Sequence, residues 1–79
     1  MKFDKNRVYT VLTADDVKIG SKGFFADTLS DLRDDVNGIF GDASYGKVDD
    51  ILDETNSRRF CMEENGFCYN LFYLIEESM

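Results

Sequence analysis

Near its C-terminus the chain runs Phe67-Cys68-Tyr69-Asn70-Leu71-Phe72-Tyr73-Leu74-Ile75, a segment that would be apolar on both faces of a strand. Such a strand is typical of the centre of a sheet covered on both sides, or of a sheet whose second face meets a partner. Asn65-Gly66 stands just before it, and Asn-Gly is a strong hairpin signal. We therefore predict a C-terminal hairpin with arms at 57–63 and 67–76 around a turn at 64–66.

Two more strands are predicted upstream, at 7–13 and 23–26, because both segments are rich in β-branched or aromatic residues. A helix should follow the second strand. Thr28 or Asp27 is a suitable N-cap, and Asn37-Gly38 supplies a stop. The apolar residues that recur at helical spacing, and that we expect to be buried, are Leu29, Leu32, Val36 and either Ile39 or Phe40.

The middle of the chain is less clearly patterned. Residues 41–46 are predicted to form a loop, and Val48, Ile51 and Leu52 then recur at a spacing that predicts a second short helix through Glu54. A strand followed by a loop fits this segment almost as well. The expected fold is a small single α+β domain over residues 1–79, with an antiparallel sheet of about four strands, one clear helix and this second short one.

Negative charge is concentrated in the same middle region. The net charge is −7 over 79 residues, and residues 23–57 carry nine acidic side chains against two basic ones. A surface of this kind repels nucleic acid and attracts basic grooves on other molecules. The predicted partner-binding residues are six aspartates on the outer faces of the two expected helices: Asp31, Asp34, Asp35, Asp49, Asp50 and Asp53.

Aspartates outnumber glutamates by eleven to five, although aspartate is the poorer helix former. Short carboxylate side chains at fixed spacing suit the imitation of a phosphate ladder. Two simpler explanations stay open, because helix caps and turns also favour aspartate and because charged faces keep small domains soluble.

The sequence contains no pattern typical of a catalytic, cofactor-binding or metal-binding site. The chain has no histidine, no phosphate-binding glycine loop and no nucleophile elbow, so we predict a protein that is not an enzyme and that uses no cofactor. A calcium loop beginning at Asp42 would need glycine where Lys47 stands and glutamate where Asp53 stands, and no metal site is predicted. The basic residues are too few and too interrupted to predict direct nucleic-acid binding.

The expected location is the cytoplasm. No segment has the length and hydropathy of a membrane span, and the charged N-terminus lacks the apolar stretch of a signal peptide. Cys61 and Cys68 are expected to be free reduced thiols in that compartment. A two-residue turn would place them diagonally on one face of the hairpin, and a three-residue turn would place them on opposite faces.

Several segments resemble small proteins of phages and prophages of Firmicutes. They are Arg7-Val8-Tyr9-Thr10-Val11-Leu12-Thr13 and its continuation to Lys22, then 25–32, Arg59-Phe60, and Tyr69-Asn70-Leu71-Phe72-Tyr73-Leu74-Ile75-Glu76-Glu77. The resemblance covers about two-thirds of the chain and implies a phage setting in the bacterial host cytoplasm, more than a mechanism. Small acidic phage proteins include anti-CRISPR and anti-restriction inhibitors, several of which occupy the basic nucleic-acid groove of their target.

Two hypotheses follow. In the first, the chain is a non-enzymatic phage-derived inhibitor that docks on the basic nucleic-acid-binding surface of a host protein, such as a CRISPR effector. In the second, it is a homo-oligomeric structural or accessory phage protein, a homodimer for example, that associates through its apolar C-terminal strand at Phe72 or Tyr73.

Overall fold

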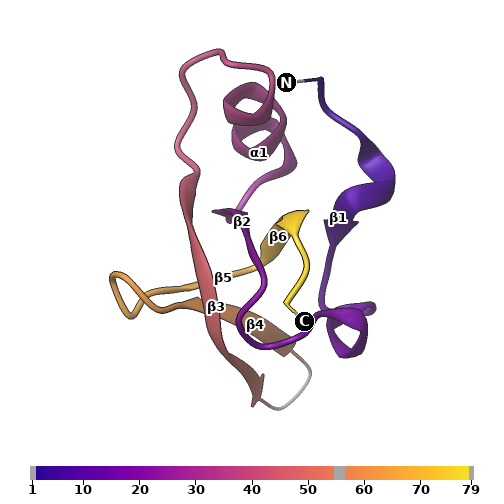
Figure 1. Cartoon of the computed structure of the whole chain (residues 1–79), viewed down its shortest axis with the longest axis vertical. Helices are drawn as coiled ribbons and strands as arrows, with labels where there is room; N and C mark the ends of the chain where they lie inside the picture. Colours follow the sequence, from indigo (N-terminus) through magenta and orange to yellow (C-terminus); the bar gives the residue numbers. More distant parts are fainter. Residues whose placement is uncertain (1, 55–56, 79) are drawn as a thin grey trace.

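The computed structural model describes residues 2–54 and 57–78, and in these residues one α-helix and a six-stranded antiparallel sheet form the predicted α+β fold (Figure 1). The elements are η1 (Lys5–Arg7), β1 (Val8–Tyr9), η2 (Ala14–Asp16), β2 (Lys22–Ala26), α1 (Leu29–Val36), β3 (Ser44–Glu54), β4 (Ser57–Met62), β5 (Cys68–Tyr69) and β6 (Leu71–Glu76). The sheet order is β1-β6-β2-β3-β4-β5, with more strands than the sequence predicted. None of the helices in this part of the chain is long and apolar enough to cross a membrane.

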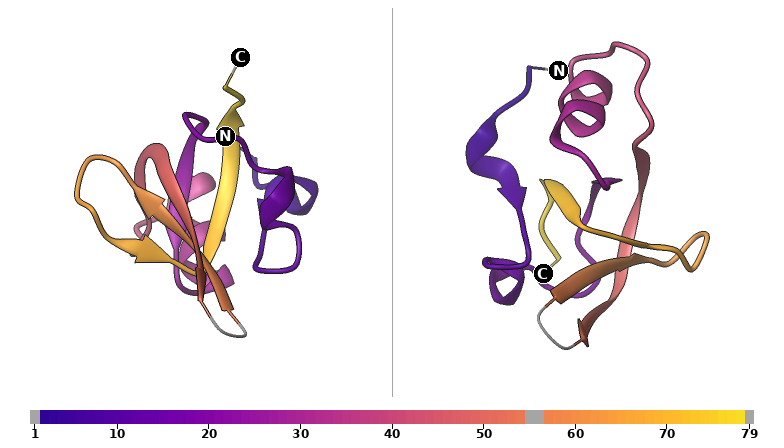
Figure 2. Two further views of the ribbon diagram at one scale, coloured as in Figure 1. Left: turned by 90° about the horizontal axis from the view of Figure 1, so that it is seen from below. Right: turned by 180° about the vertical axis from the view of Figure 1, so that it is seen from behind.

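The C-terminal strand β6 lies inside the sheet, between β1 and β2, as its two apolar faces predict. Phe72 and Tyr73 are neighbours in sequence, so they point to opposite faces, and each is buried in a different core. The long strand β3 bends, and β4 then crosses over β6 (Figure 2). Strand β4 covers the Phe72 core with Phe60, whose ring lies 5.9 Å from that of Phe72. The Tyr73 core is covered by α1, through Leu32 and Val36.

Helix α1 begins as predicted. The Thr28 hydroxyl oxygen accepts the N–H of Asp31 at 3.2 Å and donates its proton to the Asp31 carboxylate at 2.9 Å, which satisfies a free group of the first turn. Gly38 adopts a φ of +86°, a left-handed conformation that ends the helix. The predicted apolar face is only partly right, because Leu32 and Val36 are buried while Leu29, Ile39 and Phe40 are exposed.

The predicted second helix at 48–54 is wrong, and the alternative of a strand is nearer the structure, since β3 covers the whole segment. The predicted loop at 41–46 is also shortened, because β3 already begins at Ser44. A β-bulge explains the misleading pattern: between Val48 and Asp50 the pairing with β4 skips one residue. The extra residue places Val48 and Ile51 against the same core at a spacing of three, which imitates a helix.

The first strand is shorter than the predicted 7–13. After β1 the chain turns, and threonine hydroxyl groups accept hydrogen bonds from backbone N–H groups. Thr13 Oγ1 accepts the N–H of Thr10 at 3.0 Å, and Thr10 Oγ1 accepts the N–H of Leu12 at 3.2 Å. Such local bonds compete with a sheet ladder. The predicted strand at 23–26 is confirmed, as β2.

The hairpin turn is confirmed, but its second arm divides. Residues 63–67 lie between β4 and β5, and the N–H of Met62 donates to the carbonyl of Phe67 at 2.9 Å, which closes a four-residue turn at 63–66 with Gly66 at a φ of +72°. At Asn70 the chain leaves β4 and continues as β6, which pairs with β1 and β2 instead. The backbone N–H of Asn70 donates to Asp27 Oδ1 at 3.1 Å, so a side chain from beyond β2 satisfies the group at the break.

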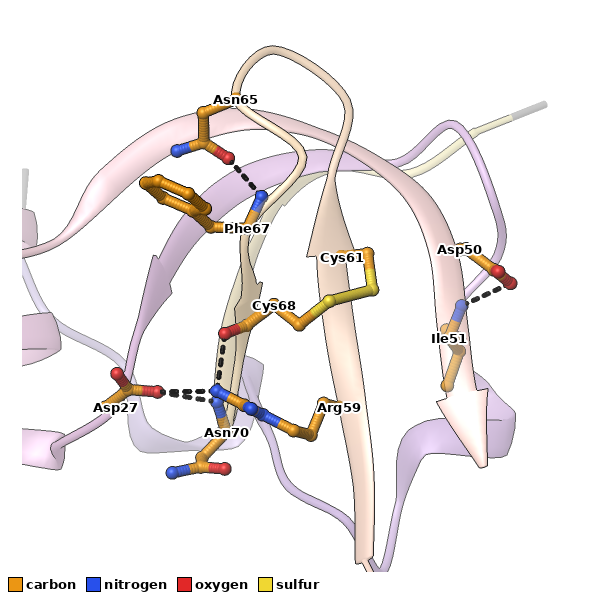
Figure 3. The surroundings of a disulfide bond; sticks show 9 residues. All are labelled: Asp27, Asp50, Ile51, Arg59, Cys61, Asn65, Phe67, Cys68 and Asn70. Atoms are coloured by element: carbon orange, nitrogen blue, oxygen red, sulfur yellow. Dashed lines mark hydrogen bonds and ion pairs between the residues drawn. A yellow bond between two sulfur atoms is a disulfide. The ribbon is translucent and has the colours of Figure 1, made fainter. Parts of the chain in front are cut away.

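The expectation of free thiols is wrong: Cys61 and Cys68 form a disulfide (Figure 3). The four-residue turn differs from both turns considered above, and it places the two cysteines directly opposite each other on β4 and β5. Residues that face each other in antiparallel strands are close enough to be bridged. Because disulfides are rare in a reducing cytoplasm, the bond removes one argument for the predicted cytoplasmic location.

Candidate functional site

The six aspartates predicted to bind a partner form two separate groups. Three lie on α1 at one end of the molecule, and three lie on the far half of β3 at the other end (Figure 1). The helix group is Asp31, Asp34 and Asp35, and the strand group is Asp49, Asp50 and Asp53. They do not form one continuous acidic face, because the segment that carries the second group is a strand that runs away from α1.

Asp35 is mainly a structural residue. Its Oδ1 accepts the backbone N–H of Gly41 at 3.2 Å, and its Oδ2 accepts that of Ala43 at 2.7 Å. Hydrogen bonds to a carboxylate are stronger than those between neutral groups. Asp35 therefore fixes the loop that leads from α1 to β3.

The same loop packs closely against the helix. A Cβ atom at Gly41 would lie 2.7 Å from the carbonyl oxygen of Asp31 and 3.3 Å from Cβ of Asp34, so a larger residue would push the loop away. Gly41 therefore holds its two neighbours in sequence, Phe40 and Asp42, beside the acidic turns of α1.

Phe40 is 94% exposed and Ile39 is 60% exposed. Both follow the left-handed Gly38, where the N–H of Ile39 donates to the carbonyl of Asp34 at 2.8 Å, so they are presented by an ordered turn. Exposed apolar side chains that lie together and are surrounded by polar groups often mark a protein-interaction site. We call this surface the α1 patch and define it as Asp31, Asp34, Ile39, Phe40 and Asp42.

The sequence predicted that either Ile39 or Phe40 is buried, because both spacings from Val36 continue the helical pattern, whereas both residues are exposed. The signal that separates them was present in Gly38. A residue that ends the helix also ends the 100° rotation per residue, so the residues after it no longer share the buried face.

The charge around the α1 patch is strongly negative. Between residues 27 and 42 the chain has five aspartates and one arginine, a net charge of 1 − 5 = −4. Arg33 forms an ion pair with Asp34 at 3.8 Å, in which the arginine side chain is half exposed and that of Asp34 is one-third exposed. Exposed pairs of this kind are weak, so the patch keeps its negative field.

The strand group offers a different surface. Asp49 is the extra residue of the β-bulge, and Asp50 Oδ1 accepts the N–H of Ile51 at 2.8 Å. Asp53 pairs with Arg58 in the register of β3 and β4. Among the described residues of this half of β3, no large apolar residue is more than half exposed. The strand group has charge without an apolar anchor.

Other polar clusters are structural. Glu64 Oε1 accepts the N–H of Lys47 at 3.0 Å, and this hydrogen bond, assisted by the charges of Lys47 and Lys22, lowers the pKa of Glu64. Arg59 donates to the carbonyl of Cys68 at 2.6 Å and lies 3.8 Å from Asp27, which ties β4 to β5 beside the disulfide (Figure 3). Among the described residues no group of three or more metal-ligating side chains comes together.

Comparison with protein-family models, with curated proteins and with solved structures finds no match to this chain. Function is therefore inferred from the chain's own surfaces.

Proposed function

We propose that the protein is a non-enzymatic inhibitor that binds another protein through the α1 patch, and that its partner is a nucleic-acid-handling protein with a basic surface. The observation that carries the proposal is Phe40, which is 94% exposed beside a run of carboxylates. The phage setting and a defence enzyme such as a CRISPR effector as the target are part of the same proposal, supported by the resemblance noted above.

The two kinds of side chain in the patch have different tasks in binding. An aromatic side chain that enters a pocket gives most of the affinity of a typical interface. The surrounding carboxylates speed the encounter with a basic surface and make it sensitive to salt. A groove that binds nucleic acid could accommodate both kinds of side chain. Its lysine and arginine side chains would attract the carboxylates, and the apolar surfaces on which bases stack would contact the aromatic ring.

The second hypothesis, association through the C-terminal strand, has less support. Strand β6 is paired on both edges, and Phe72 and Tyr73 are almost completely buried. A second copy would have to unfold part of the sheet to reach either side chain.

The proposal is tested by affinity capture of a tagged protein from lysates of Firmicutes hosts, including hosts that express a CRISPR effector, followed by a binding assay with the purified candidate. Phe40→Ala should weaken binding by about tenfold or more, as expected for a hot-spot aromatic residue. Leu12→Ala is the matched control, since Leu12 is 91% exposed in the turn after β1 and lies outside the patch.

Two results would overturn the proposal. One is equal binding by Phe40→Ala and wild type. The other is an equal loss of binding in the Leu12→Ala control, because the loss would then reflect general stickiness of exposed apolar side chains.

A further inference from the structure

A pocket of about 320 Å³ lies between the N-terminal segment and β6, on the face of the sheet that α1 covers. Its lining residues are Lys2, Asp4, Arg7, Tyr73 and Ile75. The volume is at the lower end of the range of small-molecule sites. It equals the space of about ten water molecules at ~30 Å³ each, so it is larger than a single ion requires.

The N-terminal wall of this pocket is held in place by contacts with the end of α1 and with β6. The N–H of Phe3 donates to Asn37 Oδ1 at 2.8 Å, and the Phe3 ring lies 5.4 Å from the Tyr73 ring. The N–H of Asp4 donates to Tyr73 Oη at 2.9 Å, and Arg7 Nη1 donates to the carbonyl of Leu74 at 3.0 Å. The N-terminal segment is therefore fixed against both α1 and β6.

The pocket has a positive character that is unusual in a chain with a net charge of −7. Within residues 2–54 and 57–78, neither Lys2 nor Arg7 forms an ion pair with a carboxylate. The one carboxylate in the lining, that of Asp4, is directed to η1, where its Oδ1 accepts the N–H of Asn6 at 2.9 Å. Two cationic side chains thus remain available to a ligand.

Tyr73 adds a polar group at the buried side of the pocket. Tyr73 is 1% exposed, and its hydroxyl oxygen already accepts a hydrogen bond from the backbone N–H of Asp4. No acceptor for the hydroxyl proton is found in the described residues, so this proton is available for donation to a ligand. A buried donor that gains an acceptor avoids the cost of an unsatisfied polar group.

We propose that this pocket binds a small phosphate monoester. The doubly charged phosphate group would accept hydrogen bonds from the guanidinium of Arg7, the ammonium of Lys2 and the hydroxyl of Tyr73, and Ile75 would contact the organic part. Guanidinium groups bind phosphate in a planar, two-point geometry. Three separate donors suit the three terminal oxygens of a monoester better than the two oxygens of a carboxylate. The site is separate from the α1 patch and does not depend on the function proposed for it.

The test is a titration of the ¹⁵N-labelled protein, followed by its amide NMR signals, with adenosine monophosphate, with inorganic phosphate, and with sodium chloride at matched ionic strength. Saturable shifts of residues 2–8 and 73–75 with the nucleotide support the proposal. Tighter binding of the nucleotide than of phosphate would show that the organic part occupies the pocket. Binding of inorganic phosphate alone, or shifts that chloride reproduces, would overturn it.

Variants separate this site from general charge attraction. Lys2→Gln and Tyr73→Phe should each weaken nucleotide binding by about three- to tenfold, since each removes one hydrogen bond to a charged group. Lys5→Gln is the control, because Lys5 carries the same charge on η1 outside the pocket. Tyr73→Phe keeps the buried ring, and its amide spectrum reports whether the fold is retained. If Lys5→Gln weakens binding as much as Lys2→Gln, the pocket is not the site.

Discussion

The two groups of aspartates show how residues of one type, predicted together, acquire different roles in a folded chain. On α1, the Asp31 carboxylate accepts a hydrogen bond from the hydroxyl of the N-cap Thr28, and Asp35 accepts two backbone N–H groups, so the fold uses both carboxylates. On β3, Asp49 and Asp50 lie on an exposed bulge and have no comparable long-range contact. Asp35 organises the loop that carries Phe40 beside the helix, whereas among the described residues no large apolar side chain is as exposed beside Asp49 and Asp50.

The largest expected effect on stability is that of Asp35→Ala. The substitution leaves the N–H groups of Gly41 and Ala43 without their carboxylate acceptor, which should lower the free energy of unfolding by about 2–4 kcal/mol. Urea denaturation measures the change. Asp49→Ala is the matched control from the strand group and should change stability by less than about 0.5 kcal/mol. Equal effects of the two substitutions would contradict the difference between the groups.

Removal of the disulfide, which lies on β4 and β5 near the strand group, should have the next largest effect on stability. Replacing both Cys61 and Cys68 with serine should lower the free energy of unfolding by about 2–3 kcal/mol, the value expected for a short closed loop. Wild-type protein in excess dithiothreitol should then unfold at the same urea concentration as the variant. If the reductant leaves the unfolding of the wild type unchanged while a thiol assay shows that the bond is reduced, the disulfide does not stabilise the fold.

A smaller, pH-dependent effect is expected from Glu64, which supports β3 near Lys47. The N–H of Lys47 lowers the pKa of this carboxyl in the folded protein. A lowered pKa contributes stability above the pKa of the unfolded state, and this contribution is lost as the pH falls through the folded value. Glu64→Gln should therefore be less stable than wild type at neutral pH, and the two should converge in acid. A difference that is constant with pH would contradict this origin.

The sequence predicted those parts of the fold that depend on neighbouring residues. The cap at Thr28 and the stop at Gly38 bracket α1, and the doubly apolar segment around Phe72 became the inner strand. What it could not predict depends on distant partners. The bulge at Asp49 exists because β3 pairs with β4, and the break at Asn70 is satisfied by Asp27, which lies 43 positions away.

The candidate site was predictable in its charge and not in its shape. The concentration of aspartates is visible in the composition, but the helical spacing predicted that either Ile39 or Phe40 is buried, and both are exposed. The close approach of Gly41 to α1, which brings Phe40 beside the acidic turns, is a tertiary contact that no local pattern predicts. The disulfide was missed because the cysteines were assigned to a reducing compartment, and because neither turn that we considered places Cys61 directly opposite Cys68.

The measurement that tests the α1 patch most directly compares charge reversal in the two groups, in a binding assay with the purified partner. Asp34→Lys with Asp42→Lys, and Asp49→Lys with Asp50→Lys, each change the net charge from −7 to −7 + 4 = −3. Asp31 and Asp35 are left intact because the fold uses them. The first pair should weaken binding by about tenfold or more, and the second by less than about twofold. Equal losses in the two pairs would show that overall charge, and not the α1 patch, attracts the partner.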